Sequence, residues 1–257
     1  MKFISIVAVT LLMTLKQGSA TLKKSPQAPT MSPKKGIGLS ESRGFGAAQL
    51  DSLQVSWYYN WSFTSDIHTN KTYIPMVFSI NTIEKITKSK IILGFNEPDN
   101  SNQSDISIDM ALDYWSALVQ NADRVGSPAT AGNPTQSEGW LYLFMQHKPT
   151  VDFITMHWYK GCNIQKFIED VKNVIDTYHM PVWITEFAPQ TVAESAQKPH
   201  KYTAEQVVEF IKKAIHFLEQ EPMVEKYAWH DSKTGNCAIF TDKGELTLIG
   251  KAYRDAK

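Results

Sequence analysis

The chain has 257 residues, 26 basic and 26 acidic side chains and 42% hydrophobic residues. This length and composition exclude a disulfide-stapled mini-protein and a disordered chain, and they allow one large domain. A net charge of zero lacks the basic excess that nucleic-acid-binding proteins carry, so we expect no nucleic-acid partner.

The first twenty residues have the three parts of a secretory signal peptide. A basic start at Met1-Lys2 precedes an apolar run from Phe3 to Leu15, and small residues then lead to a cleavage point after Ala20. The apolar run is too short to cross a bilayer, so a membrane anchor is not expected. We therefore predict a secreted protein, extracellular or in a cell wall, with no membrane partner.

Residues 21–35 are rich in lysine and proline and contain no acid, which predicts an extended linker. The folded domain is then 36–257, and we expect it to be a monomer. Without the lysines of the first 35 residues this domain is mildly acidic, which suits a neutral ligand better than a polyanion.

Two cysteines, Cys162 and Cys237, allow one disulfide in a secreted chain, and we predict this bridge. Two isolated thiols are the alternative, and the spacing does not indicate a zinc site. Acceptor sequences for N-glycosylation occur at Asn60, Asn70 and Asn102. We expect glycans at Asn70 and Asn102.

Short β-branched or apolar runs alternate with helix patterns along 36–257. The predicted strands are 36–39, 55–59, 74–78, 91–95, 125–129, 152–157, 182–185 and 224–229. Apolar faces predict helices at 108–122, after Ser137, at 164–178 and after a capping box at Thr203. Eight strands with helical crossovers predict a single (β/α)8 barrel of the α/β class, with short early crossovers.

An open doubly wound sheet is the alternative architecture. That fold would place a phosphate-binding loop after its first strand, but Gly44 and Gly46 lack the third glycine of the dinucleotide motif. The sequence also has no HExxH, P-loop or GxSxG pattern. We therefore expect no cofactor and no metal ion.

Polar and aromatic residues gather where the predicted strands end, which is the working face of such a barrel. Two glutamates, Glu97 and Glu186, end the fourth and seventh strands. Strand alternation would place Glu97 on the face of Leu93 and Phe95, and Glu186 on the face of Ile184. Both carboxylates are then expected to point into the mouth of the barrel.

Paired carboxylates surrounded by aromatic rings indicate the cleavage of a glycosidic bond. One carboxyl protonates the leaving oxygen, and the second attacks the sugar or activates water. A lone strand-end glutamate or a lone tryptophan would more often be structural, so it is the combination that favours a sugar-cleaving enzyme.

Six ordered motifs resemble glycoside hydrolase family 128, the group around the alkali-sensitive linkage proteins with a glycosyl hydrolase catalytic core. They are WYYNW at 57–61, GFNEPD at 94–99, GSPA at 126–129, DFITMHWY at 152–159, WITEFA at 183–188 and YAW at 227–229. The resemblance covers nearly all of 36–257. It implies a compact (β/α)8 barrel and a retaining endo-β-1,3-glucanase whose partner is a β-1,3-glucan.

The resemblance also implies roles for individual residues. Glu97 would be the acid/base and Glu186 the nucleophile, while Asn96 would hold a sugar hydroxyl. Tyr159 would hydrogen-bond Glu186, and His157 would line the same wall. The remaining substrate-binding candidates are aromatic residues expected to stack on sugar rings: Trp57, Tyr59, Trp61, Trp158 and Trp229.

Two positions depart from the expected pattern. His230 follows Trp229 where another aromatic residue is expected, which would alter one sugar subsite. Asn60 lies inside the tryptophan-rich motif, and a glycan there would crowd the cleft, so we expect this acceptor to be unoccupied.

Two other classes of function compete with a glucanase. A non-catalytic β-glucan-binding wall protein on the same barrel would not need both glutamates. A metal-dependent hydrolase using His157, Glu186 and His230 lacks a tight ligand motif. Glucan digestion in the presence of a chelator separates the three.

Overall fold

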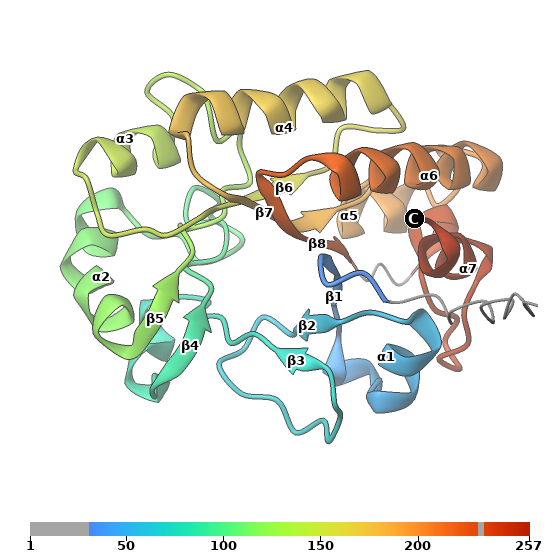
Figure 1. Cartoon of the computed structure of the whole chain (residues 1–257), viewed down its shortest axis with the longest axis horizontal. Coiled ribbons are helices and arrows are strands. Elements are labelled where there is room, and N and C mark those ends of the chain that lie inside the picture. The colour runs from blue at the N-terminus through green and yellow to red at the C-terminus, as the bar shows by residue number, and fades with distance from the viewer. Residues whose placement is uncertain (1–30, 231–233) are drawn as a thin grey trace, which may run out of the picture. The chain divides into compact units, whose positions relative to one another are not determined.

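The computed structural model describes residues 31–230 and 234–257, and the sequence-predicted signal peptide (1–20) lies outside them. The described strands are β1 (Lys35–Gly38), β2 (Trp57–Tyr59), β3 (Thr72–Tyr73), β4 (Ser89–Ile92), β5 (Ala122–Val125), β6 (Ile154–Trp158), β7 (Val182–Phe187) and β8 (Val224–His230). The described α-helices are α1 (Ala47–Leu53), α2 (Ile108–Asn121), α3 (Trp140–Gln146), α4 (Ile164–Tyr178), α5 (Val192–Gln197), α6 (Ala204–Gln220) and α7 (Leu248–Asp255). The helices lie around the outside of the strands (Figure 1).

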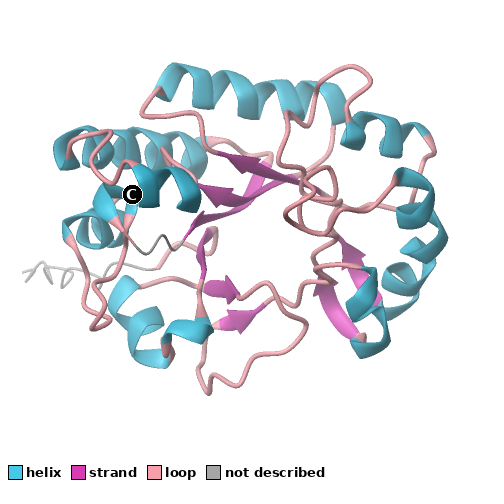
Figure 2. Ribbon diagram, turned by 180° about the vertical axis from the view of Figure 1, so that it is seen from behind, coloured by secondary structure: helices cyan, strands magenta, loops and turns pink. Residues whose placement is uncertain are grey.

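All the strands pair in parallel and together form a ring. Six of them form a sheet in the order β3-β2-β1-β8-β7-β6, and β4 pairs with β5. Single parallel bridges from Met76 to Leu93 and from Gly126 to Phe153 join the two sheets at both ends. The predicted α/β barrel is confirmed, and Figure 2 shows its strands enclosed by helices.

Two buried clusters divide the side chains of the strands. The smaller cluster lies inside the ring and contains strand residues such as Trp57, Tyr59 and Trp183 together with Leu93 and Phe153, which form bridges next to β4 and β6. The larger cluster joins the outward-facing strand residues to the helices. Membership of one cluster or the other therefore tells which way a strand residue points.

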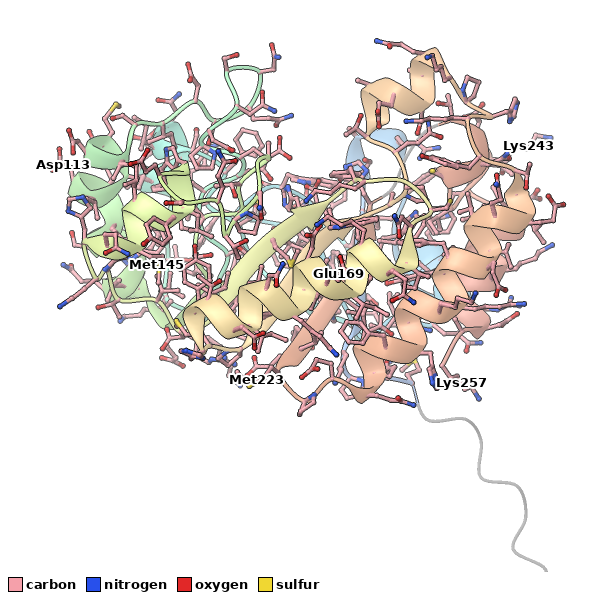
Figure 3. All side chains as sticks on the ribbon, turned by 90° about the horizontal axis from the view of Figure 1, so that it is seen from above. Asp113, Met145, Glu169, Met223, Lys243 and Lys257 are labelled. Atoms are coloured by element: carbon pink, nitrogen blue, oxygen red, sulfur yellow. The ribbon has the colours of Figure 1, made fainter. Side chains whose placement is uncertain are left out.

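The long helices begin at the residues that the sequence indicates. The side chains of Ser107, Asn163 and Thr203 accept hydrogen bonds from backbone N–H groups in the first turns of α2, α4 and α6. Charged residues such as Glu169 lie on the outer face of α4 (Figure 3). Among the described residues, no helix has both the length and the apolar character needed to cross a bilayer.

The short crossovers differ more from expectation. The helix predicted after Ser137 begins only at Trp140, and its N-cap Gly139 offers no side-chain hydrogen bond. The early crossovers are short, as expected: a 3₁₀ turn and α1 follow β1, and the 3₁₀ helix Ile80–Lys85 precedes β4.

The predicted linker 21–35 extends too far at its C-terminal end, because Lys35 begins β1 and is buried. Its Nζ donates to the carbonyl oxygens of Tyr253 and Ala256 at the end of α7. The neighbouring Lys34 donates to the carbonyl oxygens of Leu218 and Glu221 at the end of α6. Helix C-termini attract cations, so two lysines that look like linker residues hold helix ends.

The predicted disulfide between Cys162 and Cys237 is wrong, because the structure holds both residues as free thiols. Cys237 is buried, and its Sγ lies 4.0 Å from Oε1 of Gln190. Burial raises the pKa of the Cys162 thiol to about 12 and that of the Cys237 thiol to about 11. Both sulfurs are therefore protonated at neutral pH.

Candidate active site

Aromatic side chains of β2, and of the residues directly after it, form a column inside the barrel. Trp57 and Tyr59 point inward and stack with ring centroids 6.2 Å apart, and Trp61 lies 5.1 Å beyond Tyr59. Trp61 adopts a left-handed backbone with φ of 59°. This column brings Trp61 from the strand end to the mouth of the barrel.

A bulge in β7 turns Glu186 into that mouth. Met156 of β6 pairs with Ile184, but His157 pairs with Glu186, so Thr185 is an extra residue in β7. Ile184 and Phe187 both belong to the outer cluster, which leaves Glu186 facing inward. Bulges are common beside active sites because they change the direction of a side chain.

A left-handed backbone conformation at Glu97 likewise directs its side chain into the mouth of the barrel. Leu93 points inward, but Phe95 packs outward against Trp115 of α2, with ring centroids 5.8 Å apart. Glu97 has a φ of 43°, a conformation that costs free energy in a residue with a Cβ. Both glutamates reach the mouth of the barrel as predicted. The bulge in β7 and the left-handed backbone at Glu97 place them there, and regular strand alternation does not.

Four polar side chains surround the carboxylate of Glu186. Oε1 accepts a hydrogen bond from Nε1 of Trp61 at 2.7 Å, and the hydroxyl of Tyr59 lies 3.3 Å away. Oε2 accepts from the hydroxyl of Tyr159, as predicted, and Nδ1 of His157 lies 3.5 Å from it.

The pKa of Glu186 is lowered from its ordinary value. Burial disfavours the ionised carboxyl, but the nearby His157 and His230 and the hydrogen bonds from Tyr159 and Trp61 outweigh that effect. Burial and the charge of Glu186 raise the pKa of the Tyr59 and Tyr159 hydroxyls, so both remain protonated donors. The site thus favours an ionised Glu186.

His157 lies between the two glutamates. Its Nδ1 is 2.9 Å from Oε1 of Glu97, and one oxygen of each glutamate lies within 4.8 Å of the other and of this nitrogen. Burial opposes a charged ring, yet Glu186 and the hydrogen bond with Glu97 raise the pKa of His157. His157 therefore holds the two carboxylates together rather than only lining the wall.

The other oxygen of Glu97 is held from within its own turn. Nδ2 of Asn100 donates to Oε2 of Glu97 at 2.9 Å, and the backbone N–H of Asn100 donates to the carbonyl of Glu97. The carboxylate of Asp99 accepts from the backbone N–H groups of Ala131 and Gly132, at 2.8 Å each. This loop is therefore fixed to the neighbouring loop after β5.

Within the described residues, Glu97, His157 and Glu186 form a group that could hold a metal ion. This is not the predicted alternative set, because Nε2 of His230 lies 3.9 Å from Glu186 and is not part of the group. Burial lowers the pKa of His230, although Glu186 favours its charged form. Two of these three residues are also a pair of carboxylates, which is the set that glycosidic cleavage uses without a metal.

Two cavities meet at Glu97. One, of 230 Å³, contains both glutamates and Asn96, and its apolar walls are Trp61 and Phe78. The other, of 280 Å³, lies against Glu97, His157 and Tyr159 and does not include Glu186. Glu97 is therefore placed between two spaces that can each accept part of a ligand.

Asn96 lies in the first cavity, as its predicted role requires. Its side chain is buried, and Nδ2 donates to Oε1 of Gln103 at 3.3 Å. Its Oδ1 is buried and has no hydrogen-bond partner among the described residues. A buried polar atom without a partner costs free energy, so this oxygen is suited to accept from a ligand hydroxyl.

Three predicted sugar platforms are wrong. Trp57, Trp158 and Trp229 are at most 1% exposed and belong to the core. Trp158 and Trp229 point outward from the barrel against α4, α6 and α7, and Trp57 lies below Tyr59. Tyr59 is buried too and contacts Glu186 instead of a free surface. Of the five candidates, Trp61 keeps a partly exposed ring in a cavity.

Several residues of the cavities were not predicted from the sequence as site residues, and four of them carry polar or aromatic side chains close to the glutamates. Phe78 and Gln103 line the first cavity, and Asn100 and Lys160 line the second. Asn100 could have been found, because it follows the NEPD motif closely enough for a turn to return its side chain to Glu97. The others lie in loops whose paths the sequence pattern does not determine.

The glycosylation acceptors differ in their surroundings. Nδ2 of Asn60 donates to Oε1 of Glu41 at 2.6 Å and to the carbonyl of Thr64 at 2.9 Å, which supports the expectation that it carries no glycan. Asn70 and Asn102 are exposed, and their glycosylation stays a prediction.

Comparison with known proteins connects this geometry to a family. Residues 38–253 match the family described as glycosyl hydrolase catalytic core. The chain is 29% identical over 219 residues to alkali-sensitive linkage protein 1 of Schizosaccharomyces pombe, covering 77% of this chain but only 40% of that relative.

Solved structures show the same fold. The crystal structure of a mutant GH128 subgroup I endo-β-1,3-glucanase from Amycolatopsis mediterranei, in complex with laminarihexaose, is 27% identical with a TM-score of 0.76. The match covers 88% of this chain and all of that one. A GH128 subgroup VII oligosaccharide-binding protein from Trichoderma gamsii is 23% identical with a TM-score of 0.71, covering 87% of this chain and 93% of that one. That second likeness concerns the fold alone.

Proposed function

The chain belongs to the glycosyl hydrolase catalytic core family, in the group of glycoside hydrolase family 128, and we propose that it is a secreted, retaining endo-β-1,3-glucanase. One observation carries the proposal. Glu97 and Glu186 come from different strand ends, and an oxygen of each lies within 4.8 Å of the other. Retaining glycosidases place their carboxyl groups about 5–5.5 Å apart, whereas inverting enzymes leave room for a water.

Glu186 is the nucleophile of the first step. Trp61, Tyr159 and His157 favour its ionised form, and these contacts hold the carboxylate in one orientation. One oxygen attacks the anomeric carbon of the bound sugar and forms a glycosyl ester. Asn96 lies in the same cavity, where its amide can bind the neighbouring sugar hydroxyl.

Glu97 is the acid/base, and its position between the cavities suits that role. In the first step it gives a proton to the glycosidic oxygen, so the leaving sugar occupies the cavity that does not contain Glu186. In the second step the same carboxylate takes a proton from the attacking water. His157 and Asn100 hold Glu97 in place through one oxygen each.

Two findings support β-1,3-glucan as the substrate and an internal bond as the point of cleavage. The Amycolatopsis mediterranei protein is named an endo-β-1,3-glucanase and was crystallised with laminarihexaose. The two cavities on either side of Glu97 allow a chain to continue past the cleaved bond in both directions.

The signal-peptide pattern at 1–20 supports secretion, with action outside the cell or in its wall. We propose that the enzyme acts as a monomer and needs no metal or other cofactor, since two carboxylates suffice for the double displacement.

Digestion of a linear β-1,3-glucan in the presence of a chelator tests this function. We expect internal cleavage, seen as early oligosaccharides of several lengths, and its loss in both Glu97→Gln and Glu186→Gln. Binding of the glucan without cleavage by the unmutated protein would identify a carbohydrate-binding protein instead. Activity that requires added metal would contradict the two-carboxylate mechanism.

A further inference from the structure

Three buried side chains at the mouth of the barrel bring their metal-ligating atoms together. An oxygen of Glu97, an oxygen of Glu186 and a ring nitrogen of His157 all lie within 4.8 Å of one another. The side chain of His157 is 1% exposed, that of Glu186 is 6% exposed and that of Glu97 is 12% exposed. They come from different strand ends, so the ring of strands holds the three groups in place.

The spacing of these atoms is close to that of a metal site. Nδ1 of His157 lies 2.9 Å from Oε1 of Glu97 and 3.5 Å from Oε2 of Glu186. Ligand atoms bound to one zinc ion at tetrahedral angles are roughly 3.3–3.6 Å apart. An ion between the two carboxylates attracts both, so it would also draw Glu97 and Glu186 toward each other.

The charges of the group suit a divalent cation. Two carboxylates that are close together and shielded from solvent repel each other. His157 brings at most one positive charge to them, and burial opposes the charged ring. A divalent ion brings two charges to two carboxylates, which satisfies the pair completely.

A possible fourth ligand lies in the same cavity as the two glutamates. Asn96 lines that cavity and is 3% exposed. Its Nδ2 donates to Gln103, whereas its Oδ1 has no hydrogen-bond partner among the described residues. Amide oxygens are ligands for cations in proteins. This buried oxygen is therefore an independent sign that the cavity accepts a ligand with positive charge.

The donor atoms select among metal ions. One imidazole nitrogen and two carboxylate oxygens suit Zn²⁺, and Cu²⁺ binds mixed sites of this kind more tightly still. Ca²⁺ takes about six to eight oxygen ligands, and Mg²⁺ requires octahedral geometry and keeps most of its waters. The group therefore favours a divalent transition-metal ion over either of these.

The surroundings favour an exchangeable ion and not a permanent one. Histidines of metal sites almost always donate their other N–H to a partner, and loss of that partner weakens metal binding by about 10- to 100-fold. Nε2 of His157 has no such partner among the described residues. The second oxygens of Glu186 and Glu97 are already held by Trp61 and Asn100, so each glutamate offers one oxygen.

We propose that Glu97, His157 and Glu186 reversibly bind a zinc ion, or a divalent transition-metal ion of the same ligand preference, and that this ion inhibits sugar cleavage. The inhibition rests on the proposed function, whereas the binding does not. Binding releases to solvent the proton that Nδ1 of His157 shares with Glu97. The ion then occupies the electron pairs with which Glu186 attacks the sugar and Glu97 accepts a proton, so ion and sugar exclude each other.

Isothermal titration calorimetry of the full chain with Zn²⁺ tests the site. We expect saturable binding of one ion per chain and no saturable binding of Mg²⁺ at the same concentrations. Glu97→Gln and Glu186→Gln keep the side-chain shape but remove a charged ligand, so each should weaken zinc binding by at least about tenfold. If Glu186→Gln does not fold, Glu97→Gln decides, since its side chain is the more exposed of the two.

His230→Asn is the matched control. Nε2 of His230 lies 3.9 Å from Oε2 of Glu186 but is not part of the group, and a charge contact of this length contributes little. Zinc affinity should therefore stay within about threefold of that of the unmutated protein.

Digestion of a linear β-1,3-glucan tests the inhibition. Added Zn²⁺ should raise KM and leave kcat unchanged, because the ion and the sugar compete, and a chelator should restore the original rate. Zinc bound at this group with an unchanged KM would overturn the inhibition.

The remaining outcomes separate the metal site from the proposed function. An active enzyme without saturable zinc binding would overturn the site and leave the hydrolase intact. Equal zinc affinity in Glu97→Gln, Glu186→Gln and the unmutated protein would place the ion elsewhere and overturn the assignment. Zinc binding that depends on both glutamates in a protein that cleaves no glucan would support the metal site and overturn the proposed function.

Discussion

The indole N–H of Trp61 donates a hydrogen bond of 2.7 Å to Oε1 of Glu186. An aromatic side chain at the mouth of the barrel therefore also fixes the orientation of the proposed nucleophile and favours its ionised form. The left-handed backbone at Trp61, with φ of 59°, accompanies this placement.

Trp61→Phe keeps an aromatic ring but removes this donor. We expect kcat to fall about 10- to 100-fold, because a hydrogen bond to a charged group contributes about 1.5–3 kcal/mol. The pKa of Glu186 loses one of the groups that lower it, so the acidic limb of the rate profile should move to higher pH. Steady-state rates measured across acidic pH test both effects.

Phe78→Leu is the control for this prediction, since Phe78 lines the same cavity without a hydrogen bond to Glu186. It should raise KM and leave the acidic limb in place. If Trp61→Phe also raised only KM, the indole would be a stacking surface and not a positioning group.

Trp229→Ala should destabilise the protein and not act on the substrate. Trp229 is fully buried, packs against Phe187 and Tyr253, and donates to the carbonyl of Cys237 at 3.0 Å. We expect a loss of about 3–5 kcal/mol in the free energy of unfolding, with glucan affinity unchanged in the folded fraction. Thermal unfolding and binding measurements decide this, and weaker binding at an unchanged melting temperature would contradict the buried position.

Lys35 should make stability depend on alkaline pH. Burial lowers its pKa to about 8, against 10.5 for an ordinary lysine. Between these values the unfolded chain binds more protons than the folded one, so the free energy of unfolding rises with pH. Relative to Lys35→Met, the unmutated protein should gain stability from about pH 8 to 10.5. Denaturant unfolding at several pH values measures this difference. An equal change with pH in the free energy of unfolding of both proteins would contradict the prediction.

The cysteines allow a simple chemical test. A thiol reagent applied to denatured, unreduced protein should titrate both Cys162 and Cys237, because the structure holds them as free thiols. Prior reduction should not increase the count. A result of no thiols before reduction would show that the bridge forms after all.

The sequence predicted the order of elements well because the strong signals are local. The apolar faces at 108–122 and 164–178 and the capping residue Thr203 determine helices with little help from the rest of the chain. The two glutamates were found because each follows a strand. Their inward direction depends on the extra residue Thr185 and on the left-handed Glu97, neither of which follows from strand alternation.

The sequence could not predict which aromatic residues are buried in the core and which lie at the mouth of the barrel. Trp57 and Trp61 belong to one motif, but only the second lies at the mouth. Trp229 looks like a strand-end platform, although it points outward beneath α7. Lys35 looked like part of a solvated linker because the helix end that it contacts is formed by residues more than 200 positions away.

The retaining mechanism is tested most directly by proton NMR of the first product formed from a β-1,3-linked oligosaccharide. Two displacements at the anomeric carbon, the first by Glu186, predict that the β anomer appears first and the α anomer only later, through mutarotation. Glu186→Ala with added azide should instead give the inverted α-glycosyl azide. The α anomer as the first product of the unmutated enzyme would contradict the double displacement.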